Sequence, residues 1–348
     1  MWSFSQLEVR WHRIRYWEYW PFGLVYFPVF FLWVYYSIRA RTPFFFNASN
    51  PGFPNGGFIM DSKKHIYDLI PKQYYPETHF IKAGSSLNEV EALIASKSFP
   101  IILKPDVGLR GHAVRKIDNA AEWRAYHAKA NFDYLCQDFI EYPNEIGVFY
   151  VRYPDQPHGT ITGIVAKEFV DVVGNGTDSI WRLLQKEPRF AMHLDTLQLQ
   201  WGLRLNDILE PGEVFRAVPL GNHCRGAKFV DASAQISPAL IEVIDQICVQ
   251  VPGFYFGRLD LMYRDWESLE KGEAFSIIEL NGAASEPTHI YDPSHSIWFG
   301  WKELFRHIGI MFDIARKNKS NGHAYLSWQT GMEQYRLHRE EVRKFSVF

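Results

Sequence analysis

Four polar side chains suited to a metal or phosphate site stand at alternate positions in two otherwise apolar segments, residues 257–263 and 275–282. They are Arg258 and Asp260 in the first segment and Glu279 and Asn281 in the second. Side chains alternate between the two faces of a strand, so each pair shares one face. Carboxylate and amide oxygens suit a hard cation such as Mg²⁺, whose other ligands are commonly phosphate oxygens and waters. The pattern therefore predicts a metal and phosphate site.

The polar stretch between the two segments, residues 264–273, contains Gly272 and predicts a chain reversal that pairs the strands antiparallel. If the pairing sets Arg258 opposite Glu279, all four side chains point to the same face, whereas a slip of one residue would separate them. Two structural alternatives remain open. The segment could be a solvated hairpin with a surface ion pair, and Arg258 could simply pair with Glu279.

A lysine followed by a glycine-bearing turn comes earlier in the chain. Residues 99–105 form a short apolar run that contains Lys104, and residues 106–114 include Gly108 and Gly111 before a second apolar strand. Glycines let backbone N–H groups approach phosphate oxygens, and lysine adds a positive charge, so this turn could cradle phosphate. A plain hairpin turn is the alternative. The spacing excludes the Gly-x-x-x-x-Gly-Lys-Ser/Thr phosphate loop.

The order of these segments resembles the ATP-grasp superfamily, in particular its carboxylate-amine ligases of the D-alanine–D-alanine ligase type. The resemblance runs from Phe99 to Lys317, and residues 172–180 and 221–227 are locally similar to cyanophycin synthetase. It implies an α/β (α+β) ATP-grasp fold in which two α/β lobes grip ATP. Fold resemblance alone names no substrate.

The resemblance assigns a set of residues to the nucleotide. These are Lys104 and Lys167 at the phosphates, Gly108 and Gly111 in a glycine-rich flap, Gln137, Phe139 and Ile140 at the adenine, and Glu145 at the ribose. Relatives usually open the adenine hinge with Glu, where this chain has Gln137. ATP is therefore the expected nucleotide, with one or two Mg²⁺ ions and Mn²⁺ as a substitute.

The resemblance also assigns the metal and the reacting groups. Asp260, Glu279 and Asn281 inherit the role of Mg²⁺ ligands, while Arg258 and the backbone N–H of Gly282 match the positions that stabilise the tetrahedral oxyanion. The implied enzyme is an ADP-forming ligase that joins a small-molecule carboxylate to an amine through an acyl phosphate. A phosphotransferase on the same fold and a non-catalytic nucleotide-binding membrane scaffold are the alternatives. Glu286, Thr288 and His289 could contact the amine or be ordinary loop residues.

Composition limits the partners. The chain of 348 residues has a net charge of −2, which gives no general attraction to nucleic acid. Its three cysteines are too few and too irregularly spaced for a disulfide framework or a zinc site. With 47% hydrophobic residues, the chain can bury one large core or two modest lobes.

The amino-terminal segment differs from the rest of the chain. Residues 20–38 carry no charge, are rich in Trp, Tyr and Phe, contain Pro21 and Pro28, and are flanked by arginines on both sides. Aromatic residues favour the headgroup boundary of a bilayer, so we expect an interfacial anchor rather than a span. The expected location is cytoplasmic, peripheral or monotopic on the inner face of a bacterial cell membrane, where a substrate could be lipid-linked. A buried aromatic segment packed on the lobes or in a homodimer is the alternative.

The remaining organisation is expected to comprise four parts. They are residues 1–41 as a membrane-associating segment, 42–98 as a small amino-terminal lobe, 99–317 as the ATP-grasp domain and 318–348 as a charged, solvated terminal helix or tail. The aromatic residues 44–46 predict a short buried strand, and residues 62–70 and 87–95 predict helices. The Asn and Gly cluster at 47–57 could line a pocket or turn the chain.

Overall fold

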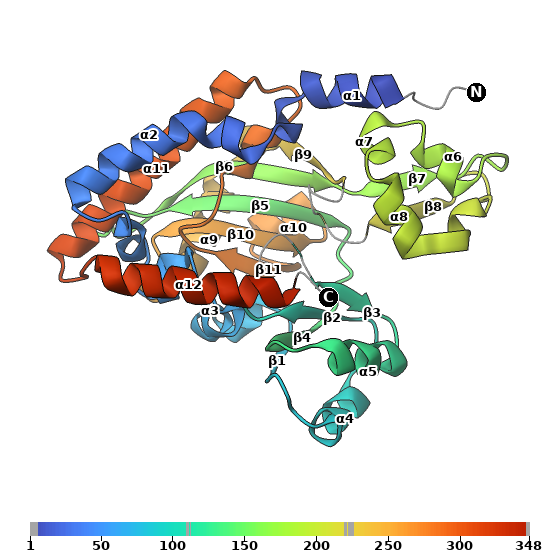
Figure 1. The fold of residues 1–348 in the computed structure, drawn as a ribbon, viewed down its shortest axis with the longest axis horizontal. Coiled ribbons are helices and arrows are strands. Elements are labelled where there is room, and N and C mark those ends of the chain that lie inside the picture. Colours follow the sequence, from blue (N-terminus) through green and yellow to red (C-terminus); the bar gives the residue numbers. More distant parts are fainter. Residues whose placement is uncertain (1–5, 109–110, 112, 219–220, 222–225, 346–348) are drawn as a thin grey trace.

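The computed structural model describes residues 6–108, 111, 113–218, 221 and 226–345. Within these residues the chain forms three antiparallel sheets with helices on their faces (Figure 1), so the predicted α/β class is confirmed. The helices are α1 (Gln6–Arg15), α2 (Phe22–Ala40), α3 (Lys63–Leu69), α4 (Leu87–Ser96), α5 (Ala120–Lys129), α6 (Ile180–Leu184), α7 (Pro188–Ala191), α8 (Leu194–Trp201), α9 (Pro238–Cys248), α10 (Trp266–Glu270), α11 (Ile297–Ser320) and α12 (Trp328–Phe345). The strands are β1 (Thr78–Ile81), β2 (Ile101–Pro105), β3 (Arg115–Ile117), β4 (Tyr134–Asp138), β5 (Asn144–Val151), β6 (Thr160–Glu168), β7 (Val170–Val173), β8 (Val214–Val218), β9 (Lys228–Asp231), β10 (Phe256–Tyr263) and β11 (Phe275–Asn281).

The smaller four-stranded sheet has the order β1-β4-β2-β3. Helices α4 and α5 bury their apolar faces in its core, where Trp123 is fully buried. Helix α4 begins at a capping box between Ser86 and Glu89, which satisfies two otherwise unpaired N–H groups. The helices expected near 62–70 and 87–95 are confirmed as α3 and α4. Residues on both sides of position 98 build this sheet, because β1 pairs with β4.

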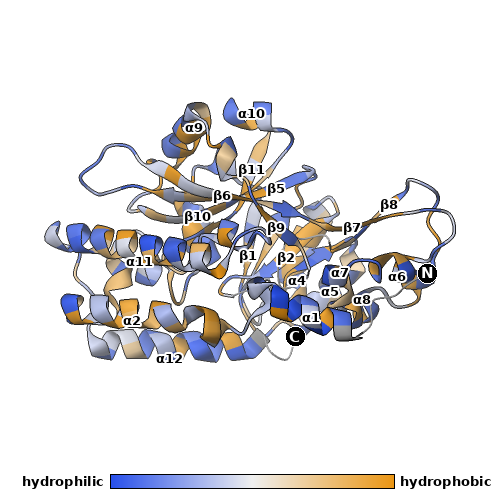
Figure 2. Cartoon of the chain, turned by 90° about the horizontal axis from the view of Figure 1, so that it is seen from above, coloured by the Kyte–Doolittle hydropathy of each residue, from blue (hydrophilic) through white to orange (hydrophobic). Residues whose placement is uncertain are grey.

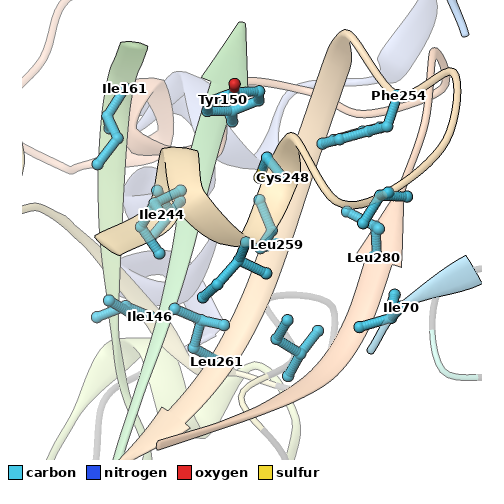
Figure 3. Packing of buried hydrophobic residues seen from close by; sticks show 14 of the residues in the cluster. Ile70, Ile146, Tyr150, Ile161, Ile244, Cys248, Phe254, Leu259, Leu261 and Leu280 are labelled. Atoms are coloured by element: carbon cyan, nitrogen blue, oxygen red, sulfur yellow. The ribbon is translucent and has the colours of Figure 1, made fainter. Parts of the chain in front are cut away.

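The larger five-stranded sheet has the order β11-β10-β5-β6-β9 and holds the main core. Residues 145–151 of β5 are all buried, as expected for a strand covered on both faces. Figure 3 shows one side of this core, where Leu259 and Leu261 of β10 pack against Ile244 and Cys248 of α9. Helix α11 and the segment 45–49 cover the opposite face. Each fully buried Leu or Ile contributes roughly 1.5–3 kcal/mol to this packing.

The predicted antiparallel pairing of the two strands is confirmed for β10 and β11. Arg258 lies opposite Asn281 and Asp260 lies opposite Glu279, which is two residues from the register that would set Arg258 opposite Glu279. A shift of two preserves the faces, since the side-chain period of a strand is two. The next pair is Leu261 with Ile277, which leaves Ile278 as the extra residue of a β-bulge.

The expected strand at residues 44–46 is wrong, because this stretch enters a 3₁₀ helix, Phe45–Ser49. Its aromatic side chains are nevertheless buried, against α11. The following Asn50 is fully buried, and its amide donates to the carbonyls of Gly56 (3.0 Å) and Phe256 (2.8 Å). Its oxygen accepts from the backbone N–H groups of Tyr255 and Phe256, both at 2.9 Å. These bonds occupy the Asn50 amide and fasten the turn to β10, which supports a structural role for it.

The remaining elements form two groups. Strands β7 and β8 pair and share a small core with α6, α8 and the nearby helical turns. Helix α2 lies along α11, and α1, α2 and α12 run along one edge of the molecule (Figure 2). The solvated terminal helix expected after residue 317 begins only at Trp328, because α11 continues to Ser320.

Candidate active site

Lys104 connects the four-stranded sheet to the five-stranded sheet. Its Nζ donates to Oε1 of Gln137 (2.9 Å) on β4 and to the carbonyl oxygen of Ile278 (3.0 Å) on β11. A third bond goes to the hydroxyl of Tyr67 (2.8 Å) on α3, so its three ammonium protons are all used. Burial lowers the pKa of Lys104 to about 7, since the charged form is desolvated.

The bulge in β11 explains why a carbonyl is available to this lysine. Ile278, the extra residue of the bulge, has no opposing partner on β10, and its carbonyl oxygen accepts from both Lys104 and the Tyr67 hydroxyl. A bulge commonly re-aims a group near a functional site. The local irregularity therefore connects the smaller sheet to the strand that carries Glu279.

A buried cluster of charges lies on the neighbouring strands. Arg258 donates two hydrogen bonds to Asp260, from Nε to Oδ1 at 2.8 Å and from an Nη to Oδ2 at 3.0 Å. Lys167 on β6 contacts Glu145 on β5 at 2.5 Å and Asp260 at 3.4 Å. All four side chains are largely buried. The cluster thus alternates cations and carboxylates, which offsets the cost of removing each charge from water.

The pKa directions in this cluster follow from burial and opposing charge. Burial alone would raise the pKa of Asp260, but Arg258 and Lys167 together hold it below its ordinary value. For Lys167, burial lowers the pKa and the carboxylates of Asp260 and Glu145 raise it, with a net increase. Both groups are therefore ionised at neutral pH.

Glu279 and Asn281 are less engaged than Asp260. The Glu279 side chain is 33% exposed, and its nearest cation is Nζ of Lys63 at 3.6 Å. Burial raises its pKa, but Lys63 and other cations lower it further, so the net pKa is below the usual value. The side-chain nitrogen of Asn281 is buried without a hydrogen-bond partner. Such an unsatisfied amide is costly unless another group meets it.

The donor set fits a hard cation only with help from outside the chain. In the described residues, no group of three or more His, Cys, Asp or Glu side chains is placed to hold a metal ion. Asp260 and Glu279 supply two carboxylates and Asn281 an amide, and Mg²⁺ usually takes one or two carboxylates with phosphate oxygens and waters. The chemistry of these donors suits Mg²⁺ held between protein and phosphate.

Two glycines are required by close packing around this cluster. A Cβ on Gly147 of β5 would lie 2.9 Å from Oδ1 of Asp260 and 3.1 Å from Cδ of Arg258. A Cβ on Gly282 would lie 2.5 Å from the carbonyl oxygen of Gly56. Gly282 therefore lets the chain after β11 pass tightly against the turn at 56–57.

The other predicted nucleotide residues lie around these strands. Phe139 and Ile140 follow β4 directly and are partly buried, with Nζ of Lys116 5.0 Å from the Phe139 ring centre. The backbone N–H of Gly221 donates to Oε2 of Glu145 at 3.1 Å, so this carboxylate is bonded on both oxygens. The carbonyl of Gly108 accepts from Nζ of Lys63 at 3.2 Å.

Parts of two expected loops lie outside the described residues. In the glycine-rich flap these are Leu109, Arg110 and His112, and in the loop from Gly221 to Ala227 they are residues 222–225. A surface hollow of about 520 Å³ lies elsewhere, on α12 between Met332 and Arg343, and none of its lining residues belongs to the charged cluster.

Solved structures similar to this one include two ligases named for D-alanine and a glutathione synthetase. A D-alanine–D-alanine ligase from Bacillus anthracis matches with a TM-score of 0.41 and 10% identity, covering 75% of this chain and 68% of the ligase. The VanG D-Ala:D-Ser ligase from Enterococcus faecalis gives 0.41 and 13%, covering 72% and 61%. A bifunctional glutathione synthetase from Pasteurella multocida gives 0.36 and 13%, covering 70% of this chain but only 36% of the synthetase. No protein-family model matches the sequence, and no curated protein matches it.

Sequence reasoning did not find Lys63, Tyr67 or Asp61, which lie at or just before α3. Lys63 faces Glu279, and Tyr67 bridges Lys104 and Ile278. Burial raises the pKa of Asp61 to about 7, and its Oδ1 has no hydrogen-bond partner. The available signal was the Ser62-Lys-Lys start of a helix, which reveals the helix but not what its first turn faces.

Proposed function

We propose that this protein is an ATP- and Mg²⁺-dependent ligase that joins a carboxylate to an amine and releases ADP and phosphate. One observation carries the proposal. Lys104 from the smaller sheet and Lys167 from the larger one converge with Asp260 and Glu279, which face each other on β10 and β11. Two cations and a pair of carboxylates, contributed by two sheets, suit a triphosphate with its metal.

Each residue of the candidate site is assigned a role from its charge and its position. Lys104 and Lys167 would offset phosphate charge, with Gly108 and Gly111 in the flap above it. The residues at the adenine would be Gln137, Phe139 and Ile140, with Glu145 at the ribose. Asp260, Glu279 and Asn281 would hold Mg²⁺, which supplies charge neutralisation at the phosphates.

Ligation would run in two steps that balance. A carboxylate oxygen attacks the γ-phosphorus, the bond to the bridging oxygen of ADP breaks, and an acyl phosphate forms. The amine nitrogen then attacks the acyl carbon, inorganic phosphate leaves, and the amine loses a proton to solvent. Arg258 and the N–H of Gly282 would stabilise the oxyanion of the second step, since donors fixed in advance favour the transition state.

A phosphotransferase would stop after the first transfer, and isotope labelling separates the two reactions. With heavy oxygen in the substrate carboxylate, ligation is expected to place one labelled oxygen in each released phosphate, measured by mass spectrometry. The label reaches phosphate only if the acyl carbon–oxygen bond breaks. A phosphorylated product without labelled free phosphate would contradict ligation and support the phosphotransferase.

We also propose that the chain works at the membrane surface through residues 20–38, which form most of α2. Support comes from the composition of this helix and from its exposed apolar side chains. A scaffold without catalysis is the competing reading. Two results together would favour the scaffold. The unmodified chain would turn over no ATP with any carboxylate and amine in a broad screen, and Asp260→Asn would associate with membranes as the unmodified chain does.

Nucleotide affinity is expected to depend on the charge of Lys104. Its pKa is about 7 in the free protein, and phosphate favours the charged form, so affinity should be highest below pH 7. Above that pH it should fall, approaching tenfold per pH unit as binding takes up one proton. Calorimetric titration with ADP between about pH 6 and pH 9 measures this slope.

Two variants, Lys104→Met and Asp61→Asn, identify the group whose titration causes the fall in ADP affinity with pH. Asp61 titrates in the same range, and its negative form would also weaken binding. If Lys104 is responsible, Lys104→Met binds weakly with a flattened slope and Asp61→Asn keeps the slope. An unchanged slope in Lys104→Met would show that another group is titrating.

A further inference from the structure

Helix α2 has two unlike faces. Val25 and Val29 are buried against α11, while the opposite half of the helix exposes a continuous apolar stripe. The stripe consists of Leu24 (55% exposed), Phe27 (62%), Phe30 (60%), Phe31 (59%), Val34 (38%), Tyr35 (51%) and Ile38 (72%). Spacings of three and four residues place these side chains on one side of a helix. So large an exposed apolar stripe marks a surface that meets another apolar phase.

The buried face of α2 is held by specific bonds. The indole N–H of Trp301 donates to the carbonyl of Val25 at 2.8 Å, and the hydroxyl of Tyr26 bonds the carboxylate of Glu286. Farther along, Tyr36 stacks on Phe312 with ring centres 4.3 Å apart. Crossing a bilayer would require α2 to leave α11 and give up these contacts, since only one of its faces is free.

The one-sided packing of α2 distinguishes an interfacial helix from a spanning one. Within the described part of the chain, it is the one helix long and apolar enough to cross a bilayer, with a mean hydropathy of 1.3. A buried core helix or a signal sequence would pass the same criterion. The one-sided packing is therefore the informative observation, because a helix that lies in the interface needs one apolar and one anchored face.

Exposed cations stand at both ends of the stripe. Arg10 and Arg15 lie on α1 before it, and Arg39 and Arg41 follow it. Exposed apolar residues stand beside the arginines of α1, at Trp11 (63%) and Ile14 (61%), and Trp298 (72%) is exposed at the start of α11. In a pair of stripes from two copies, either direction of packing would bring arginines against arginines. Anionic headgroups complement both ends instead.

We propose that this face docks on an anionic lipid surface, with α2 parallel to the membrane plane and its stripe inserted into one leaflet. The inference rests on the proposed membrane association and makes it specific: monotopic, not spanning. Trp, Tyr and Phe side chains suit the headgroup boundary, and the arginines remain at its aqueous side. Both sheets of the candidate site would then stand on the same side of the membrane as the amino terminus.

The test is flotation of the full chain with vesicles of phosphatidylcholine, alone or mixed with phosphatidylglycerol. We expect Phe27→Glu combined with Phe31→Glu to lower binding to mixed vesicles by at least about tenfold. Binding of the unmodified chain should weaken with added salt and with pure phosphatidylcholine, because the arginine contribution is screened or lost. Leu199→Glu is the matched control, as Leu199 is 90% exposed on α8, away from this face, and should float normally.

Protease accessibility decides the orientation. A tag at the amino terminus of vesicle-bound protein should remain open to protease added outside, whereas a shielded tag would show a spanning helix and overturn the proposal. Equal flotation of the double variant and the unmodified chain would also overturn it. If, in addition, the unmodified chain formed a dimer and the double variant a monomer, the apolar stripe would be the interface with a second copy of the chain.

Nucleotide binding, measured on the same proteins in detergent, separates this proposal from the ligase. The double variant should bind ADP as the unmodified chain does, which also shows that it is folded. Vesicle binding without any nucleotide binding in the unmodified chain would contradict the ligase and leave the docking surface standing.

Discussion

Replacing Glu279 with glutamine is expected to lower ATP turnover at least about a hundredfold while the protein remains folded, because Mg²⁺, which would neutralise charge at the phosphates, loses one of its carboxylate ligands. Glu279 is 33% exposed and contacts Lys63 only at 3.6 Å, so its contribution to stability is small. A loosely held ion pair of this kind is typically worth less than about 1 kcal/mol. Magnesium-dependent ADP release, measured with saturating substrates, gives the effect.

Glu273→Gln is the matched control, since Glu273 is an exposed carboxylate in the turn between β10 and β11. It should leave both turnover and unfolding unchanged. Equal turnover in Glu279→Gln and the unmodified chain would remove Glu279 from the site. A loss of turnover that accompanied unfolding would assign it a structural role instead.

Asp260→Asn is expected to have the largest effect on stability. The substitution leaves Arg258 buried without its carboxylate and deprives Lys167 of one of its two anionic partners. Removing one member of a buried ion pair typically costs about 3–5 kcal/mol, because an unpaired charge remains in a poorly solvated place. Urea unfolding, followed by circular dichroism, measures the change.

Two further measurements show whether the loss comes from the ion pair. Combining Asp260→Asn with Arg258→Met should lower the free energy of unfolding by less than the sum of the single changes, the difference being roughly 0.5–3 kcal/mol.

The pKa of Asp260 is held below its ordinary value, so its stabilisation is present above the unfolded pKa and is lost as pH falls through the folded pKa. The stability gap between the unmodified chain and the variant should therefore narrow below about pH 4. A gap independent of pH would contradict this origin.

The sequence predicted the two strands that carry part of the buried charged cluster, because two short strands with alternating polar residues are a local signal. The shared face of Arg258, Asp260, Glu279 and Asn281 followed from the strand period, whereas the register itself did not follow from the sequence. The bulge at Ile278 bonds to Tyr67 of α3, a distant segment, and no local sequence pattern predicts it. A local sequence pattern indicates which face of a strand a side chain occupies, but it does not indicate which residue lies opposite on the next strand.

Contacts between distant segments escaped prediction for the same reason. Lys63 reaches Glu279 across more than two hundred positions, and nothing in Ser62-Lys-Lys indicates that meeting. The aromatic run at 44–46 signalled burial correctly but not its 3₁₀ conformation, since short apolar runs do not distinguish strands from helical turns. For α2, the composition suggested an interfacial helix, and the structure added which of its faces is free.

Calorimetric titration of the full chain with ATP, with and without magnesium, tests most directly whether the two sheets form a metal–nucleotide site. We expect saturable binding, in the range of about 1 μM to 1 mM that is typical of Michaelis constants, and this binding should weaken without magnesium and in Glu279→Gln. Absence of binding, or equal binding with and without magnesium and in the variant, would contradict the account.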